Sequence, residues 1–144
     1  MEKQEGLTQL QVQRRLAHSP EHVWKALTDP AEVVQWMQVP SADIDGRPDG
    51  HVDIGARLHI TGRVLTWDPP RVFEHEFKLA PSKAMPTGED AILRYELEPD
   101  GDGCVLKVTF TRLTPAGARL ISGGGLHKGF DRLEAHLAVR AGGP

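Results

Sequence analysis

The sequence predicts an α+β fold in which helices support a curved antiparallel sheet. Three observations predict it: two short helical patterns that meet at Asp29-Pro30, a series of strand patterns separated by short turns, and an amphipathic segment near the C-terminal end. The close spacing of the strands favours antiparallel neighbours, because parallel strands need a longer crossover. A length of 144 residues suits one domain, so we expect a single domain over residues 1–144 with its core at about 10–139.

The first strand and the helical pair have recognisable signals. Apolar and polar residues alternate over residues 10–16, which predicts a strand that lies at an edge of the sheet. Ser19 followed by proline is typical of a helix start, so a first helix should begin there. Asp29-Pro30 should end this helix and start a second one over residues 31–37.

After the helical pair the pattern changes from loop to strands. The run over residues 41–51 is rich in Gly, Asp and Pro and predicts a solvent-exposed loop. Turn clusters then separate the expected strands, which cover residues 52–54, 57–68, 72–79, 91–98 and 104–113.

The last part of the chain has a helical pattern. Thr114-Pro115 is a second cap-and-proline signal, and apolar residues three or four apart follow up to Leu137. The triplet Gly123-Gly124-Gly125 interrupts this pattern, so the helix either starts afresh there or bends.

Composition and charge exclude several classes of protein. The net charge of −3, with no run of Lys and Arg, gives no positive field for nucleic acid or anionic membranes. The chain has no apolar stretch of membrane-spanning length and no signal-peptide pattern, so we expect no membrane insertion and a cytoplasmic location. Cys104 is the one cysteine, which rules out an intrachain disulfide or a thiolate zinc cluster, and we expect it to lie within a strand.

Four phrases of the sequence carry a family resemblance. In chain order they read VWKALTDPAEVVQWM, TGRVLTWDPPRVFEHEF, LRYELEPDGDG and GLHKGFDRLEAHLA. They resemble the SRPBCC (START-like) superfamily and, more narrowly, its activator-of-heat-shock-ATPase-like (AHSA-type) branch. The resemblance implies a helix-grip fold: a curved antiparallel sheet wrapped around a long C-terminal helix, with two short helices after the first strand. It also implies a cavity between sheet and helix that holds an apolar or aromatic small molecule in many relatives.

The sequence departs from the family pattern at four positions. Met37, Phe77, Phe110 and Leu126 stand where other residues are usual, and all four should belong to the walls of the cavity. The ligand of a relative therefore cannot be carried over to this chain.

His75 and Tyr95 are the polar candidates for the cavity wall. Period-two geometry places His75 on one strand face with Phe73 and Phe77, and places Tyr95 on the inner face of the next strand. A buried neutral imidazole can serve as a general acid or base or anchor a polar group of a ligand. The alternative is a core histidine that hydrogen-bonds one neighbour.

Four further apolar residues should close the two ends of the cavity. They are Trp36 and Met37 from the second helix and Leu126 and Phe130 from the last, and each could equally be ordinary core. The predicted ligand-binding set is therefore Trp36, Met37, Phe73, His75, Phe77, Tyr95, Phe110, Leu126 and Phe130. No pair of histidines has metal-site spacing, so we expect neither a metal nor a cofactor.

Three functions are compatible with this pattern. The first is a small soluble protein that binds a hydrophobic or aromatic molecule, because no nucleophile, base and orienting group stand together in a motif and no catalytic residue is assigned. The second is a cyclase-, aromatase- or hydrolase-like enzyme that uses His75 and Tyr95. The third is a co-chaperone-like module, whose binding site would serve a protein partner or form a homodimer.

Overall fold

The computed structural model describes residues 8–55, 59–83, 86, 88–122 and 126–142. Its strands are β1 (Thr8–Leu16), β2 (Ser41–Ile44), β3 (His51–Gly55), β4 (Ile60–Asp68), β5 (Val72–Leu79), β6 (Glu89–Asp100) and β7 (Gly103–Leu113). Its helices are α1 (Pro20–Thr28), α2 (Pro30–Met37), α3 (Pro115–Leu120) and α4 (Leu126–Gly142). The strands form one antiparallel sheet in the order β1-β7-β6-β5-β4-β3-β2.

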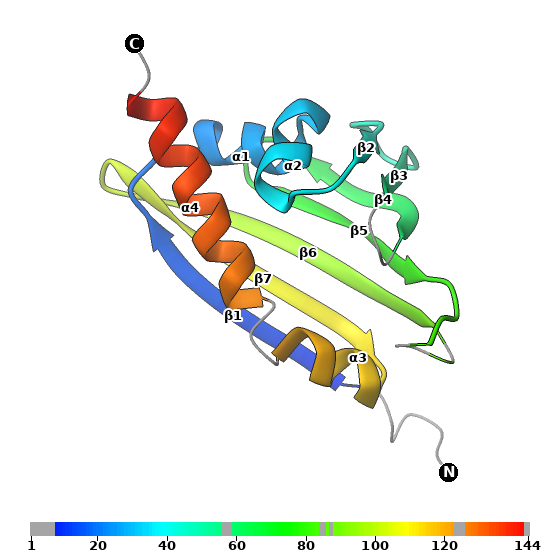
Figure 1. The fold of residues 1–144 in the computed structure, drawn as a ribbon. Helices are drawn as coiled ribbons and strands as arrows, with labels where there is room; N and C mark the ends of the chain where they lie inside the picture. The colour runs from blue at the N-terminus through cyan, green and yellow to red at the C-terminus, as the bar shows by residue number, and fades with distance from the viewer. Residues whose placement is uncertain (1–7, 56–58, 84–85, 87, 123–125, 143–144) are drawn as a thin grey trace.

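The sheet curves around α4, which crosses its inner face (Figure 1). The helices α1 and α2 lie beside one end of α4, and α3 lies at the opposite end of the sheet next to β1 and β7 (Figure 1). This arrangement confirms the predicted α+β helix-grip fold. The position of β1 at an edge of the sheet, with β7 as its neighbour, is confirmed as well.

One aspartate makes the joint between α1 and α2. The backbone N–H of Asp29 donates to the Lys25 carbonyl at the end of α1, and its Oδ1 accepts the N–H of Ala31 at 3.0 Å in the first turn of α2. Ser19 caps α1 in the same way by accepting the N–H of His22 at 3.2 Å. These side chains satisfy amide groups that a helix start leaves without partners, which is why the predicted boundaries hold.

The strands agree with the sequence pattern except at residues 41–51 and at the start of β4, which begins at Ile60; residues 57–58 of the expected strand lie outside the described residues. β5 has the predicted bounds, and β6 and β7 extend to the tight turn at residues 101–102. The expected loop over residues 41–51 is wrong at both ends, because residues 41–44 form β2, which pairs with β3, and β3 begins at His51. Ala42 and Ile44 pack against the core beneath while Ser41 and Asp43 point to solvent, an alternation hidden among the turn-forming residues that follow.

The first strand is tied to the last helix across the inner face. Arg14 of β1 reaches Asp131 at 2.9 Å and Glu134 at 2.7 Å, and its guanidinium carbon lies 4.9 Å from the centre of the Phe130 ring. The guanidinium packs over an apolar ring while its Nη1 pairs with both carboxylates. The contacts hold α4 against the β1 edge of the sheet.

The C-terminal part contains two separate helices, α3 and α4, and the glycine triplet between them lies outside the described residues. A buried carboxylate fixes the start of α3: Glu89 accepts the backbone N–H of Thr114 at 3.0 Å and its hydroxyl at 2.9 Å. Gly117 lets this carboxylate approach, since a Cβ there would stand 1.9 Å from Glu89 Oε1. Cys104 is buried in β7, as predicted.

Two apolar clusters fill the space under the sheet. The larger one joins β1, β6 and β7 to α1 and α4, and includes Leu16, Val23, Leu106, Leu133 and Leu137. The smaller one lies under β3, β4 and β5 around Phe73 and Val64. The candidate site lies between the inner face of the sheet and α4, next to both clusters.

Candidate functional site

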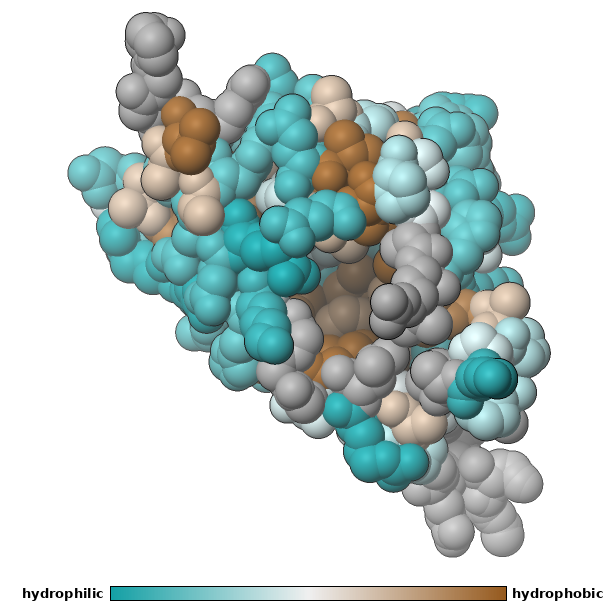
Figure 2. Space-filling model, viewed as in Figure 1, coloured by the Kyte–Doolittle hydropathy of each residue, from teal (hydrophilic) through white to brown (hydrophobic). Residues whose placement is uncertain are grey.

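A cavity of about 450 Å³ lies between the inner face of the sheet and α4. It opens to solvent through a hollow with an apolar floor (Figure 2). Its lining comprises Leu27, Trp36, Met37, Ile54, Ile60, His75, Phe77, Leu93, Tyr95, Leu106, Val108, Phe110, Ile121, Leu126, Gly129, Phe130, Arg132 and Leu133. Most of these side chains are apolar, as is usual for pockets that hold small molecules.

Eight of the nine side chains in the predicted set meet at this cavity, and Phe73 does not line it. Phe73 is only 1% exposed and packs with its ring centre 5.4 Å from that of Trp67 and 6.2 Å from that of Trp24. It therefore belongs to the smaller apolar cluster. The four positions that depart from the family pattern, Met37, Phe77, Phe110 and Leu126, all lie in the cavity wall.

His75 presents an uncharged ring to the cavity. Its Nδ1 lies 2.7 Å from the Glu76 carbonyl, and because a carbonyl oxygen can only accept, Nδ1 carries the proton. Burial lowers the pKa of His75 to about 4, which outweighs the opposing effects of that hydrogen bond and of the Glu74 and Glu76 charges. At neutral pH the ring therefore holds a bare Nε2 lone pair that can accept one hydrogen bond.

Tyr95 brings the second polar group to the wall. Its ring stacks on Phe73 with the centres 5.9 Å apart, and burial raises the pKa of its phenol to about 12. Tyr95 pairs directly with Phe73 across β5 and β6, whereas His75 pairs with Leu93, so the two polar residues are offset along the strands. Among the described residues no hydrogen bond joins His75 to Tyr95.

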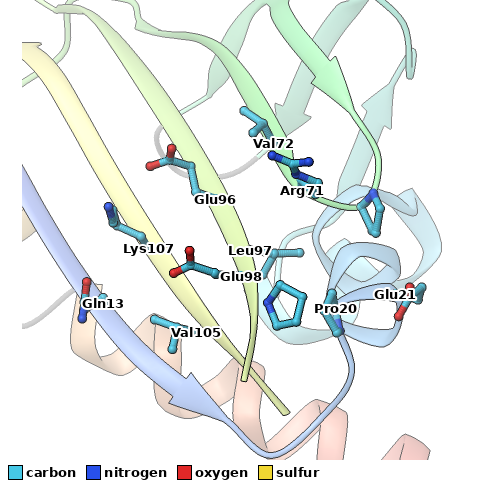
Figure 3. Close-up of a pocket in the computed structure, with 12 residues that line it drawn as sticks. Gln13, Pro20, Glu21, Arg71, Val72, Glu96, Leu97, Glu98, Val105 and Lys107 are labelled. Carbon is cyan, nitrogen blue, oxygen red and sulfur yellow. The ribbon is translucent and has the colours of Figure 1, made fainter. Parts of the chain in front are cut away.

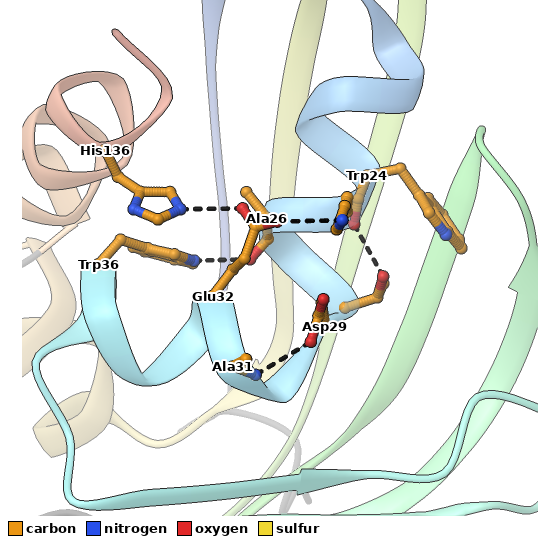
Figure 4. A network of polar contacts seen from close by, with 9 residues as sticks. Trp24, Ala26, Asp29, Ala31, Glu32, Trp36 and His136 are labelled. Carbon is orange, nitrogen blue, oxygen red and sulfur yellow. Dashed lines mark hydrogen bonds and ion pairs between the residues drawn. The ribbon is translucent and has the colours of Figure 1, made fainter. Parts of the chain in front are cut away.

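The helical end of the cavity is held by a buried polar network (Figure 4). The indole N–H of Trp36 donates to the Ala26 carbonyl at 2.7 Å, which sets the ring of Trp36 against the cavity. Glu32 of α2 lies 2.9 Å from His136 Nε2 of α4, and the two side chains are only 5% and 8% exposed. Lys25 approaches the other carboxylate oxygen at 3.9 Å. The network ties α1, α2 and α4 together at one end of the cavity.

Arg132 is a lining residue that the sequence reasoning missed. It supplies the one charged side chain in the cavity wall, and its Nε is buried without a hydrogen-bond partner among the described residues. One feature of the sequence could have singled out Arg132. The residues three and four positions away on α4 are Lys128, Gly129, Ala135 and His136, and none of them is acidic. An arginine with no carboxylate one turn away lacks the usual helical partner.

A second hollow, of about 650 Å³, lies on the outer face of the sheet (Figure 3). Figure 3 shows Glu96, Glu98 and Lys107 projecting from neighbouring strands, and Arg71 and Glu21 also line it. Glu96, Glu98 and Lys107 lie on the strands, Arg71 in the turn before β5 and Glu21 in α1, so the hollow is lined by charges of both signs. The inner cavity, though smaller, has the apolar walls and few polar groups expected of a small-molecule site, so we regard it as the candidate site.

The described residues contain no cluster of three or more His, Cys, Asp or Glu side chains that could hold a metal ion. No helix in that part of the chain is both long enough and apolar enough to cross a membrane. The cavity as built can enclose an apolar molecule, accept a hydrogen bond at His75, donate one from Tyr95 and pair a negative charge with Arg132.

Comparisons with known structures support the fold. A protein from Mesorhizobium loti, MLL2253, superposes with a TM-score of 0.80 at 24% identity, covering 91% of this chain and 97% of that one. A putative uncharacterized protein from Rhizobium leguminosarum gives 0.77 at 19% identity, with 92% and 95% covered. CalU16 from Micromonospora echinospora gives 0.70 at 21% identity, with 90% and 75% covered. At these identities the likeness concerns the fold alone.

No curated protein sequence matches the chain. The family model described as "Activator of Hsp90 ATPase homolog 1-like protein" matches residues 17–138, a stretch that runs from the start of α1 into α4. Because this match covers most of the sequence, the chain belongs to the Activator of Hsp90 ATPase homolog 1-like family.

Proposed function

We propose that this protein binds an apolar or aromatic small molecule in the cavity between the sheet and α4. The observation that carries the proposal is the cavity of about 450 Å³, whose walls are apolar apart from a few polar side chains. When an apolar molecule displaces water from such walls, apolar surface is removed from water, and this lowers the free energy of the system. The resemblance to relatives with a ligand cavity points in the same direction.

Gly129 offers a direct test, because it faces open space on the cavity side of α4. A Cβ built at this glycine meets no atom within 4 Å, so Gly129→Leu would extend into the cavity without a clash at its first atom. Leucine also favours a helix over glycine by roughly 0.5–1 kcal/mol, so the variant should fold at least as well. Gly129→Ala is the matched control, since it gains helix propensity and fills little of the cavity.

Binding can be followed with N-phenyl-1-naphthylamine, an uncharged apolar dye that fluoresces when it leaves water. The native protein and Gly129→Ala should bind the dye, and Gly129→Leu should bind it at least roughly ten-fold more weakly, a loss of about 1.4 kcal/mol. Thermal unfolding of all three proteins checks that the fold is intact. Equal dye binding by Gly129→Leu, or no dye binding by the native protein, would refute the proposal.

An enzyme that uses His75 is the second candidate, favoured by its uncharged ring and bare Nε2 at the cavity wall. The offset of His75 from Tyr95 argues against a direct proton relay between them. Native mass spectrometry of the purified protein would identify a bound molecule. The isolated molecule would then be incubated with newly purified native protein and, separately, with His75→Phe. A change in its mass with the native protein alone would establish catalysis, whereas an unchanged mass with both would favour binding.

A protein-binding role is supported by the family description rather than by a docking surface. The exposed large apolar side chains of the described residues are Leu65 and Val139, which lie on β4 and α4. Two separate side chains do not make the contiguous apolar patch that marks an interface.

A further inference from the structure

We infer that the molecule held in the cavity is an apolar monoacid whose carboxylate pairs with Arg132. This inference rests on the proposed function and adds the chemical class of the ligand. It follows from three features of the described residues: the missing partner of Arg132, the engagement of the nearby acids elsewhere, and the absence of negative charge from the cavity wall.

Arg132 has no partner within reach on its own helix. Its Nε is shielded from solvent and makes no hydrogen bond with any described residue, although a buried guanidinium N–H normally finds an acceptor. The side chains one turn away belong to Lys128, Gly129, Ala135 and His136. None carries a negative charge, so the helix itself supplies no acceptor.

The acids nearest to Arg132 in the chain are already engaged. Asp131 and Glu134 both bind Arg14, at 2.9 Å and 2.7 Å. Across the helix interface, Glu32 binds His136 at 2.9 Å. None of these three carboxylates forms a hydrogen bond with the Nε–H of Arg132.

The part of the cavity wall that the structure describes has no negative charge to neutralise Arg132. The described residues of its lining include no Asp or Glu, and their two other ionisable groups, His75 and Tyr95, are uncharged at neutral pH. The Nε–H of Arg132, shielded from solvent and without an acceptor among the described residues, is costly unless a ligand atom accepts its hydrogen bond. A ligand with an apolar body and an anionic end would supply that acceptor while filling the space beside it.

A carboxylate fits a single arginine best. The planar guanidinium offers parallel N–H groups that match the two oxygens of a carboxylate. Among the described residues the lining provides one cation, Arg132, which balances one negative charge. The apolar body of the acid would then lie along Phe77, Phe110 and Phe130.

Competition against N-phenyl-1-naphthylamine can test the inference with three probes of equal chain length: decanoate, decan-1-ol and decylamine. In the native protein at neutral pH, decanoate should displace the dye at a concentration at least roughly ten-fold below that of decan-1-ol, because hydrogen bonds to charged groups are the stronger ones. Arg132→Met keeps an unbranched apolar stem and removes the charge, so both probes should then act within about two-fold of each other. Arg132→Lys should keep part of the preference for the acid.

Lys128→Met is the matched control, since it removes one positive charge from the exposed side of α4 without touching the cavity. It should leave the preference for decanoate unchanged. If the native protein binds the dye but decanoate and decan-1-ol displace it equally well, or decylamine displaces it best, the carboxylate inference is overturned. The proposed function would still stand in that case. A preference that survives in Arg132→Met would overturn the role of Arg132. Failure of the native protein to bind the dye would refute the proposed function, and the inference with it.

Discussion

Replacing His136 with alanine should loosen the C-terminal helix from α2. The Glu32 and His136 side chains are 5% and 8% exposed, and their polar atoms are 2.9 Å apart. A hydrogen bond to a charged group contributes roughly 1.5–3 kcal/mol, and removing one member of a buried pair costs roughly 3–5 kcal/mol. Lys25, whose side chain is 58% exposed, stays 3.9 Å from the Glu32 carboxylate and keeps it partly compensated. We therefore expect His136→Ala to lower the free energy of unfolding by about 2–3 kcal/mol.

A double-mutant cycle isolates the pair from other effects of the substitutions. Urea unfolding of His136→Ala, Glu32→Gln and the double variant should give a coupling energy of roughly 1.5–3 kcal/mol. For a chain of this size, each kcal/mol corresponds to roughly 2–4 °C in the unfolding midpoint, so a thermal scan provides an independent reading. Lys25→Met is the control and should cost no more than about 1 kcal/mol, as for other exposed ion pairs. A coupling energy below about 0.5 kcal/mol would refute the argument that this contact holds α4 in place.

Three further predictions concern single residues. Because burial lowers the pKa of His75 from 6.5 to about 4, the unfolded chain binds a proton before the folded one does. The free energy of unfolding should therefore fall by about 3 kcal/mol between pH 6.5 and 4 and be unaffected by this group above pH 6.5. Urea unfolding of His75→Leu should lack this loss, and parallel pH curves for the two proteins would contradict the assignment. Gln38, which ends α2 with a φ of 59°, is exposed, so Gln38→Gly should raise the free energy of unfolding by roughly 0.5–1 kcal/mol while Gln38→Ala should not; a gain for both would point to another cause. Cys104 is buried and its burial raises the pKa of the thiol, so a disulfide reagent should label it slowly in the folded protein and promptly in urea; prompt labelling without urea would show that β7 opens readily.

Local signals account for most of the fold. Asp29-Pro30 was informative because one side chain both ends α1 and caps α2, a role that depends only on neighbouring residues. β5 was predicted with its correct bounds because its alternation is bounded by turn residues on both sides. β2 was missed because it has only four residues, and its pairing with β3 outweighs the turn propensity of the segment that it opens.

The candidate site could be predicted only in part. Strand alternation placed His75, Phe77 and Tyr95 on the inner face, because it depends on the period of the element. The cavity itself, and the place of Phe110 in its wall, were expected from the family resemblance. Phe73 has the same alternation as His75, yet the tryptophans from α1 and β4 cover its ring, and no period reveals which neighbours do so. The pairing of Glu32 with His136 joins residues 104 positions apart, so it depends on tertiary structure alone. The sequence shows that Arg132 has no acid one turn away, but that Asp131 and Glu134 pair with Arg14 instead is evident only in the tertiary structure.

The pairing of β1 with β7 has a consequence for how the chain acquires its fold during synthesis. Residues of β1 such as Leu10 lie opposite β7 residues such as Phe110, so the earliest strand has no sheet neighbour until about a hundred residues later. Its apolar side also awaits α4, which Arg14 reaches through Asp131 and Glu134. The ribosome therefore releases a strand with an uncovered apolar face long before its neighbours emerge, and closure of the β1 edge is a late step that requires a long loop to close.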